Sequence, residues 1–213
     1  MWELVKAGGW LMLPLVLCSI FTIAISIERF IRLKKSMVLP KALLMSQDQT
    51  AEQAVQELKQ DQNLQRSTLG RIFAAGNRNK NKTEKFALAQ MEVTASQEIG
   101  YLEKNINFLG TLSAVAPLLG LLGTVIGIIE SFLMIDIGTN SDPVLMMPGI
   151  SKALITTAAG MFIAIPALFA HRYFQRLVQE YVAELEQQAT LFHASLFYRS
   201  KTDVDSEDLQ KAS

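Results

Sequence analysis

Three long apolar blocks interrupt an otherwise polar chain, and the polar stretches between them have the spacing of helices. The apolar blocks cover roughly residues 9–27, 106–135 and 146–170. Apolar runs of about 20 residues have the length that an α-helix needs to cross a bilayer. The pattern therefore predicts an all-α membrane protein with three spans, at residues 9–31, 106–134 and 147–171.

The polar region at 32–105 also reads as helical. We expect one helix over 50–60 with Thr50 as its N-cap, and another over 67–77. A third starts near Thr83 and is predicted to continue without a break into the second span, because no Gly–Pro pair separates them.

After the third span, apolar residues recur at helical spacing from Phe174 to Leu196. This predicts an amphipathic helix over 172–199. Its apolar stripe would be exposed in a lone subunit, so we expect the stripe to form an interface between subunits. The polar composition of residues 200–213 predicts a disordered tail.

Positive charge follows the first and third spans and avoids the loop between the second and third. The residues concerned are Arg29, Arg32, Lys34 and Lys35 after the first span, and Arg172 and Arg176 after the third. Lys and Arg collect on the cytoplasmic side of membrane spans. The distribution places residues 1–8 and the short loop 135–146 outside, on the periplasmic side in a Gram-negative cell, and the C-terminus in the cytoplasm.

Composition argues against several other classes of protein. The net charge is zero and no basic stripe with interleaved aromatic residues is present, so nothing indicates nucleic-acid binding. The single cysteine, Cys18, allows no intrachain disulfide. His171 and His193 are too few for a metal site, and no phosphate loop or Ser/His/Asp arrangement is visible. We therefore expect no enzyme activity, no metal and no cofactor.

Polar residues within the apolar blocks cost free energy, so each needs a reason. Small residues surround the threonines Thr124 and Thr157, and they form one face on each of the two later spans: Gly120, Gly123, Gly127, Ala153, Gly160 and Ala164. Such faces either let two helices pack closely or line a lumen that accepts another helix. Their presence on both spans favours the lumen. The threonine hydroxyls either bond to their own backbone or face a bound ion or a partner's carboxyl.

Two charged residues lie toward the outer ends of these spans. Glu130 is six residues outward of Thr124, and Lys152 is five residues outward of Thr157. At 1.5 Å per residue both charges lie about 8 Å from the threonine level. This predicts an ion pair at the outer end of a lumen, with snorkelling of both side chains to water as the alternative.

The segments APLLGLLGTVIGIIESF (116–132) and PGISKALITTAAGMFIAIPALF (148–169) resemble the MotA/TolQ/ExbB proton channel family. GGWLMLPLVLCSIFTIAISIERF (8–30) matches moderately, and the three spans are most similar to the ExbB branch. The resemblance implies a homo-oligomer, a pentamer, whose lumen holds a dimer of an ExbD- or TolR-like single-span protein. The membrane Asp of that partner would take up and release protons. The resulting proton flow across the bacterial inner membrane would energise a TonB- or TolA-like protein.

The resemblance also assigns roles to individual residues. The two lumen threonines of the family fall on Thr124 and Thr157, and no titratable group of this chain lies at mid-span. Where the family typically carries a Glu early in the third span, this chain has Lys152. That departure keeps a second hypothesis open, a non-conducting membrane scaffold for the partner. A channel that works alone is disfavoured by the missing mid-span acid.

Overall fold

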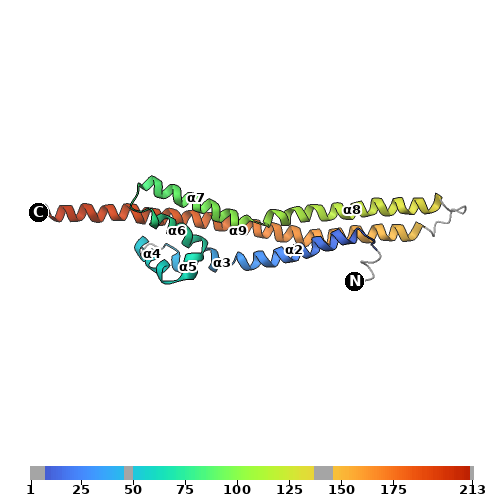
Figure 1. Ribbon diagram of the computed structural model, residues 1–213, viewed down its shortest axis with the longest axis horizontal. Helices are drawn as coiled ribbons and strands as arrows, with labels where there is room; N and C mark the ends of the chain where they lie inside the picture. The colour runs from blue at the N-terminus through green and yellow to red at the C-terminus, as the bar shows by residue number, and fades with distance from the viewer. Residues whose placement is uncertain (1–7, 46–49, 137–145, 212–213) are drawn as a thin grey trace. The chain divides into compact units, whose positions relative to one another are not determined.

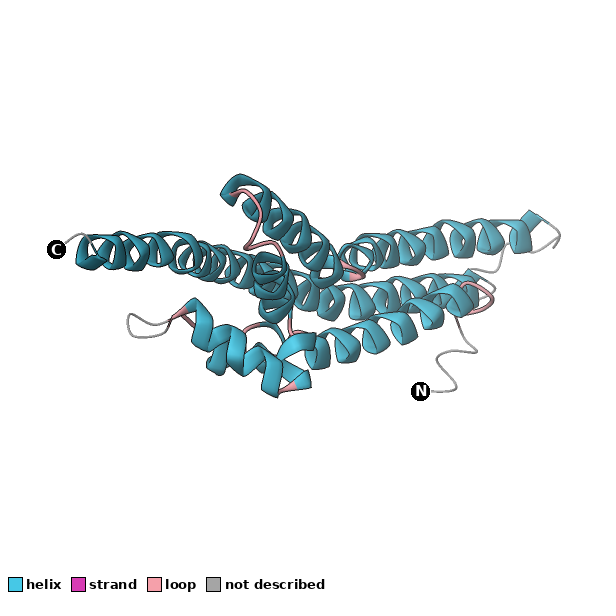
Figure 2. Cartoon of the chain, turned by 60° about the vertical axis from the view of Figure 1, so that its left-hand side comes forward, coloured by secondary structure: helices cyan, strands magenta, loops and turns pink. Residues whose placement is uncertain are grey.

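The computed structural model describes residues 8–45, 50–136 and 146–211, and these residues form helices without any strand (Figure 2). The elements, labelled in Figure 1, are α2 (Met12–Arg32), α3 (Lys35–Val38), the 3-10 helix η1 (Lys41–Leu43), α4 (Ala51–Gln60), α5 (Gln62–Arg66), α6 (Thr68–Arg78), α7 (Glu84–Glu103), α8 (Ile106–Asp136) and α9 (Met147–Lys211). The all-α prediction is confirmed for this part of the chain. The expected outer segment 1–8 and outer loop 135–146 lie largely outside the described residues.

The chain forms two compact units. One, which we call the membrane unit, consists of Met1–Arg29 and Asn105–Gln175, and the other, the polar unit, consists of Phe30–Lys104 and Arg176–Ser213. Helical segments long and apolar enough to cross a membrane occur within Met12–Arg32, Glu84–Leu133 and Met147–Phe197. The chain is therefore a multi-pass membrane protein with three candidate spans.

Small and flexible apolar residues hold the membrane unit together. Met12 and Leu15 of α2 form a buried cluster with Ala116 of α8 and Ala164 of α9. Two alanines at this junction bring the three backbones close together, which increases van der Waals contact where lipid offers no hydrophobic driving force. The three helices lie side by side in Figure 1.

The predicted continuous helix from Thr83 into the second span is broken. α7 ends at Glu103 and α8 starts at Ile106, with Asn105 between them at a φ of 66°. A left-handed residue cannot continue a right-handed helix, and Asn tolerates this conformation better than most residues. The Asn105 side chain also donates a hydrogen bond to Glu28 Oε2 of α2 at 3.1 Å. The prediction of one continuous helix was wrong, because it relied on Gly and Pro as helix breakers and neither lies between α7 and α8.

Two helices of the polar unit start close to where the sequence predicted. Thr50 accepts a hydrogen bond from the backbone of Gln53, whose side chain bonds back to the Thr50 backbone, so a capping box starts α4. The predicted helix at 50–60 is confirmed. The prediction at 67–77 is confirmed by α6, which Ser67 caps through the Gly70 N–H. The short helix α5 between them was not predicted.

The apolar stripe on α9 is buried within its own chain. Leu185 is 1% exposed and Phe192 is fully buried, and the Phe192 ring stacks on Phe73 of α6 with centroids 4.1 Å apart. The Tyr181 hydroxyl donates to the Leu33 carbonyl at 2.9 Å. We expected the stripe to be exposed in a lone subunit, and that expectation was wrong because Leu33 and α6 contact it within the same chain. The helix itself also continues to Lys211, through residues expected to be disordered.

Candidate functional site in the membrane unit

Glycines bring α8 and α9 into backbone contact. A Cβ atom on Gly120 would lie 3.0 Å from the Thr156 carbonyl oxygen and 3.0 Å from Thr157 Cα. A Cβ on Gly123 would collide with the Thr156 side chain. Only glycine leaves room for this approach, and the two helices interlock at the level of the threonines.

The rest of the small-residue face lies in the same contact. A Cβ on Gly127 would be 2.8 Å from Ala153 Cβ, and one on Gly160 would be 2.6 Å from the Ala116 carbonyl oxygen. Ala164 is also buried, at 6% exposure. The six residues that we assigned to a lumen therefore pack α8 against α9 inside one chain. This contact fits the close-packing interpretation, and a lumen formed by several chains stays a prediction.

The two threonines have different environments. The Thr157 hydroxyl donates to the Gly120 carbonyl of α8 at 2.9 Å, so it links the two helices. The Thr124 hydroxyl donates to the Leu121 carbonyl of its own helix at 2.6 Å. Both side chains are half-buried. Each hydroxyl still has acceptor capacity, because a hydroxyl oxygen carries two lone pairs. Thr156, next to Thr157, is buried and bonds to the Ala153 carbonyl at 2.8 Å.

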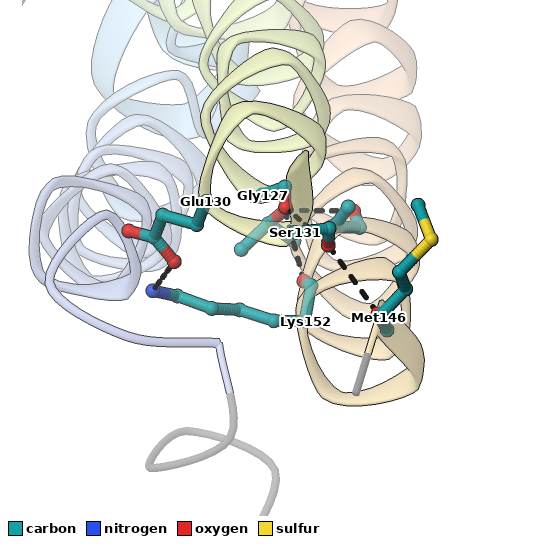
Figure 3. A network of polar contacts seen from close by, with 7 residues as sticks. Gly127, Glu130, Ser131, Met146 and Lys152 are labelled. Carbon is teal, nitrogen blue, oxygen red and sulfur yellow. Dashed lines mark hydrogen bonds and ion pairs between the residues drawn. The ribbon is translucent and has the colours of Figure 1, made fainter. Parts of the chain in front are cut away.

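The two outer charges lie against each other. Lys152 Nζ of α9 is 2.7 Å from Glu130 Oε2 of α8, and Figure 3 shows the lysine side chain reaching toward the carboxylate. Their side chains are 25% and 42% exposed. The contact forms within one chain. Each charge reduces the cost of placing the other near the end of an apolar helix.

The segment before α2 also takes part in this outer region. Gly9 adopts a φ of 72°, and a Cβ there would lie 2.9 Å from Lys152 Nζ. The glycine at position 9 therefore leaves room for the Lys152 side chain. The Ser131 hydroxyl donates to the Gly127 carbonyl at 2.8 Å and lies 3.3 Å from the Met146 carbonyl oxygen, next to the start of α9 (Figure 3). We had not assigned a role to Gly9, although the Gly8–Gly9 pair was visible in the sequence.

A histidine links the start of α8 to the end of the apolar part of α9. His171 Nδ1 lies 3.0 Å from the Ile106 carbonyl oxygen, and its ring rests on Gly110, where a Cβ would be 2.8 Å from the ring. A carbonyl oxygen only accepts, so Nδ1 carries the hydrogen. The sequence contained a signal for this contact, a glycine near the start of one span and a histidine near the end of the next.

Among the described residues, no titratable side chain lies between Ile106 and Glu130 of α8, or between Lys152 and His171 of α9. No group of three or more metal-binding side chains occurs in the part of the chain that the structure describes. The arrangement offers hydroxyls and carbonyls at the middle of the helix pair, but no acid or base that could exchange a proton there.

Fold and site together define a multi-pass helical membrane protein whose second and third spans pack through glycine and carry threonines at their centre. The profile of the MotA/TolQ/ExbB proton channel family matches residues 64–187. This match covers more than half of the sequence, and the chain belongs to that family.

Individual relatives agree with this assignment. The chain is 32% identical over 203 residues to a Synechocystis sp. protein named as biopolymer transport protein ExbB-like 1, covering 90% of this chain and 78% of the relative. It is 34% identical to the Tol-Pal system protein TolQ of Haemophilus influenzae over 53% of this chain and 51% of the relative. The biopolymer transport protein ExbB of Salmonella typhimurium is 38% identical over 40% of this chain and 35% of its own length. The chain thus spans about half, or less, of the TolQ and ExbB proteins.

Proposed function

We propose that this protein is the ExbB-like subunit of a motor in the bacterial inner membrane that is driven by the proton-motive force. With an ExbD- or TolR-like single-span partner it energises a TonB- or TolA-like protein, for outer-membrane transport or envelope maintenance. The observation that carries this proposal is the family match over the paired helices α8 and α9. These helices have hydroxyls at their centre and no titratable group there among the described residues. A proton carrier from a second protein would complete the pathway.

In this proposal the two threonines have different roles. Thr157 donates across the helix pair to Gly120, so it holds α9 in register with α8. Thr124 bonds only to its own helix and is the more available of the two for a partner's carboxylate. Replacement of Thr124 by Val, which is nearly the same shape, should leave the helix pair intact while removing a polar contact to the partner.

Assembly and orientation form part of the same proposal. The small residues of α8 and α9 are used inside the chain, whereas large apolar residues point outward, including Leu118, Leu121, Phe162 and Phe169. Such surfaces suit contact with lipid or with neighbouring subunits. A cyclic pentamer would bury part of them. The distribution of positive charge supports an orientation with the N-terminus in the periplasm and the C-terminus in the cytoplasm.

Proton flux tests the function. The chain is reconstituted in proteoliposomes with its ExbD- or TolR-like partner, and a pH-sensitive dye reports proton entry under an imposed gradient. We expect flux with the wild-type partner and none when the partner's membrane Asp is replaced by Asn. Binding of both partner forms without flux in either would support the scaffold hypothesis, which the Lys152–Glu130 pair keeps open. Native mass spectrometry of the purified protein tests the pentamer, which a mainly monomeric species would contradict.

A further inference from the structure

A cavity opens in the polar unit between α4, α6 and α7. Its volume is about 520 Å³, within the range of roughly 300–1,000 Å³ that is typical of small-molecule sites. Val55 and Leu58 of α4 and Ala74 and Ala75 of α6 form its apolar walls. The proton pathway proposed above does not use it.

The polar part of the lining is cationic. Lys59, Arg71 and Arg78 line the cavity together with the amide side chain of Asn77, and no acidic residue belongs to the lining that the structure describes. Within the described residues, Lys59 and Arg78 have no carboxylate within salt-bridge distance. Two of the three positive charges are thus left without a counter-charge beside an apolar wall.

The third cation, Arg71, is held by an ion pair. Arg71 Nη1 lies 2.8 Å from Glu98 Oε1 of α7, and the Glu98 side chain is only 11% exposed. One carboxylate engages part of the guanidinium group, which has five N–H donors. Arg71 also lines the cavity, and the ion pair restricts the conformations of the arginine in the absence of a ligand.

We propose that this cavity binds a ligand with a phosphoryl group. Two arginines and a lysine are the side chains best suited to phosphate, because the guanidinium fork matches its oxygens and ammonium supplies a point charge. The apolar wall accommodates the non-phosphate part of the ligand. Both a soluble phosphorylated metabolite and the headgroup of an anionic phospholipid have this chemistry.

Two probes separate the sources of the phosphoryl group. Calorimetry with inorganic pyrophosphate on the detergent-purified full-length protein detects a soluble ligand. Native mass spectrometry of protein from nanodiscs containing phosphatidylglycerol, compared with phosphatidylcholine, detects a retained anionic lipid. We expect at least one probe to bind. The Lys59→Gln/Arg78→Gln variant should weaken that binding by at least about tenfold, since each charge-assisted hydrogen bond contributes substantially.

A matched control distinguishes the site from general surface charge. Arg66 ends α5 as Arg78 ends α6, and Lys85 is an exposed lysine on α7, yet neither lines the cavity. The Arg66→Gln/Lys85→Gln variant makes the same change in net charge and should alter binding by less than about twofold. The single Arg78→Gln variant provides a second measurement if the double variant is poorly folded.

Two results would overturn the proposal: neither pyrophosphate nor phosphatidylglycerol binds, or the control variant loses as much affinity as the cavity variant. If no probe binds and the cavity variant alone lowers the yield of oligomer, the cations are instead assigned to contact with a neighbouring protein chain.

Discussion

The ion pair between Glu130 and Lys152 makes a quantitative prediction. Neutralising either residue, by Glu130→Gln or Lys152→Met, removes the 2.7 Å contact between Lys152 Nζ and Glu130 Oε2 and leaves the other charge near the end of an apolar helix. Neutralising both removes the contact and the uncompensated charge together. The double variant should therefore be more stable than the sum of the two single effects implies.

The size of this coupling follows from the geometry. Exposed ion pairs contribute about 0.2–1 kcal/mol, and hydrogen bonds to charged groups about 1.5–3 kcal/mol. The side chains are 25% and 42% exposed, so screening by water reduces the upper figure without cancelling it. We expect a coupling free energy of about 1–2 kcal/mol from the four proteins of the cycle.

Unfolding in mixed micelles, followed by circular dichroism as the denaturing detergent increases, measures the free energy of unfolding for each variant. The chain provides its own control, because Arg176 and Glu180 form a pair at 3.0 Å whose side chains are 83% and 59% exposed. The same cycle there should give about 0.3–0.5 kcal/mol or less. The charge-swapped variant Glu130→Lys/Lys152→Glu should also recover part of the stability and activity lost in Lys152→Glu.

Two outcomes would refute the reasoning. The first is a Glu130–Lys152 coupling no larger than that of Arg176–Glu180, which would mean that water screens both pairs equally. The second is a charge-swapped variant as defective as the sum of its single changes. In either case Lys152 would need another explanation, such as a contact with the outer segment of the partner.

Substitutions at four further residues test the site and the fold. Thr157→Val should lower the free energy of unfolding by about 1–2 kcal/mol through loss of the bond between helices, whereas Thr124→Val should cost less than about 0.5 kcal/mol and mainly reduce proton-driven transport; equal stability losses would contradict the different roles. Asn105→Ala should cost about 1–2 kcal/mol because Ala resists the left-handed conformation, and Asn105→Gly should cost less in the same assay, so a larger loss for Gly would argue against backbone strain. Leu185→Asp should cost about 3 kcal/mol or more by burying a charge in the polar unit, and a melting temperature equal to that of the wild type would show that the residue is not in a core.

The sequence by itself determined the longer helices, but not the short elements α3, η1 and α5 or the break before α8. The length of the apolar runs determines which segments can span a membrane, and this depends only on consecutive residues. The capping box of Thr50 and Gln53 starts α4 through groups three residues apart. Such local signals need no knowledge of the rest of the fold, and they were interpreted correctly.

Tertiary structure alone decided which faces are covered. The periodicity of Phe174–Leu196 showed an apolar stripe, yet only the folding of the polar unit shows that Leu185 and Phe192 are buried inside the chain. Gly120 and Gly123 formed a small-residue face in sequence, and only the structure places that face against Thr156 and Thr157 of the same chain.

The break before α8 and the pairing of the outer charges also depend on contacts between residues far apart in the sequence. Asn105 is a weaker breaker signal than Gly or Pro, and its side chain is held by a hydrogen bond to Glu28 of α2, far away in the sequence. The positions of Glu130 and Lys152 could be placed at one depth by counting residues, because rise per residue is constant along a helix. Their direct contact required the relative rotation of α8 and α9, which is determined by glycine packing between residues far apart in the sequence.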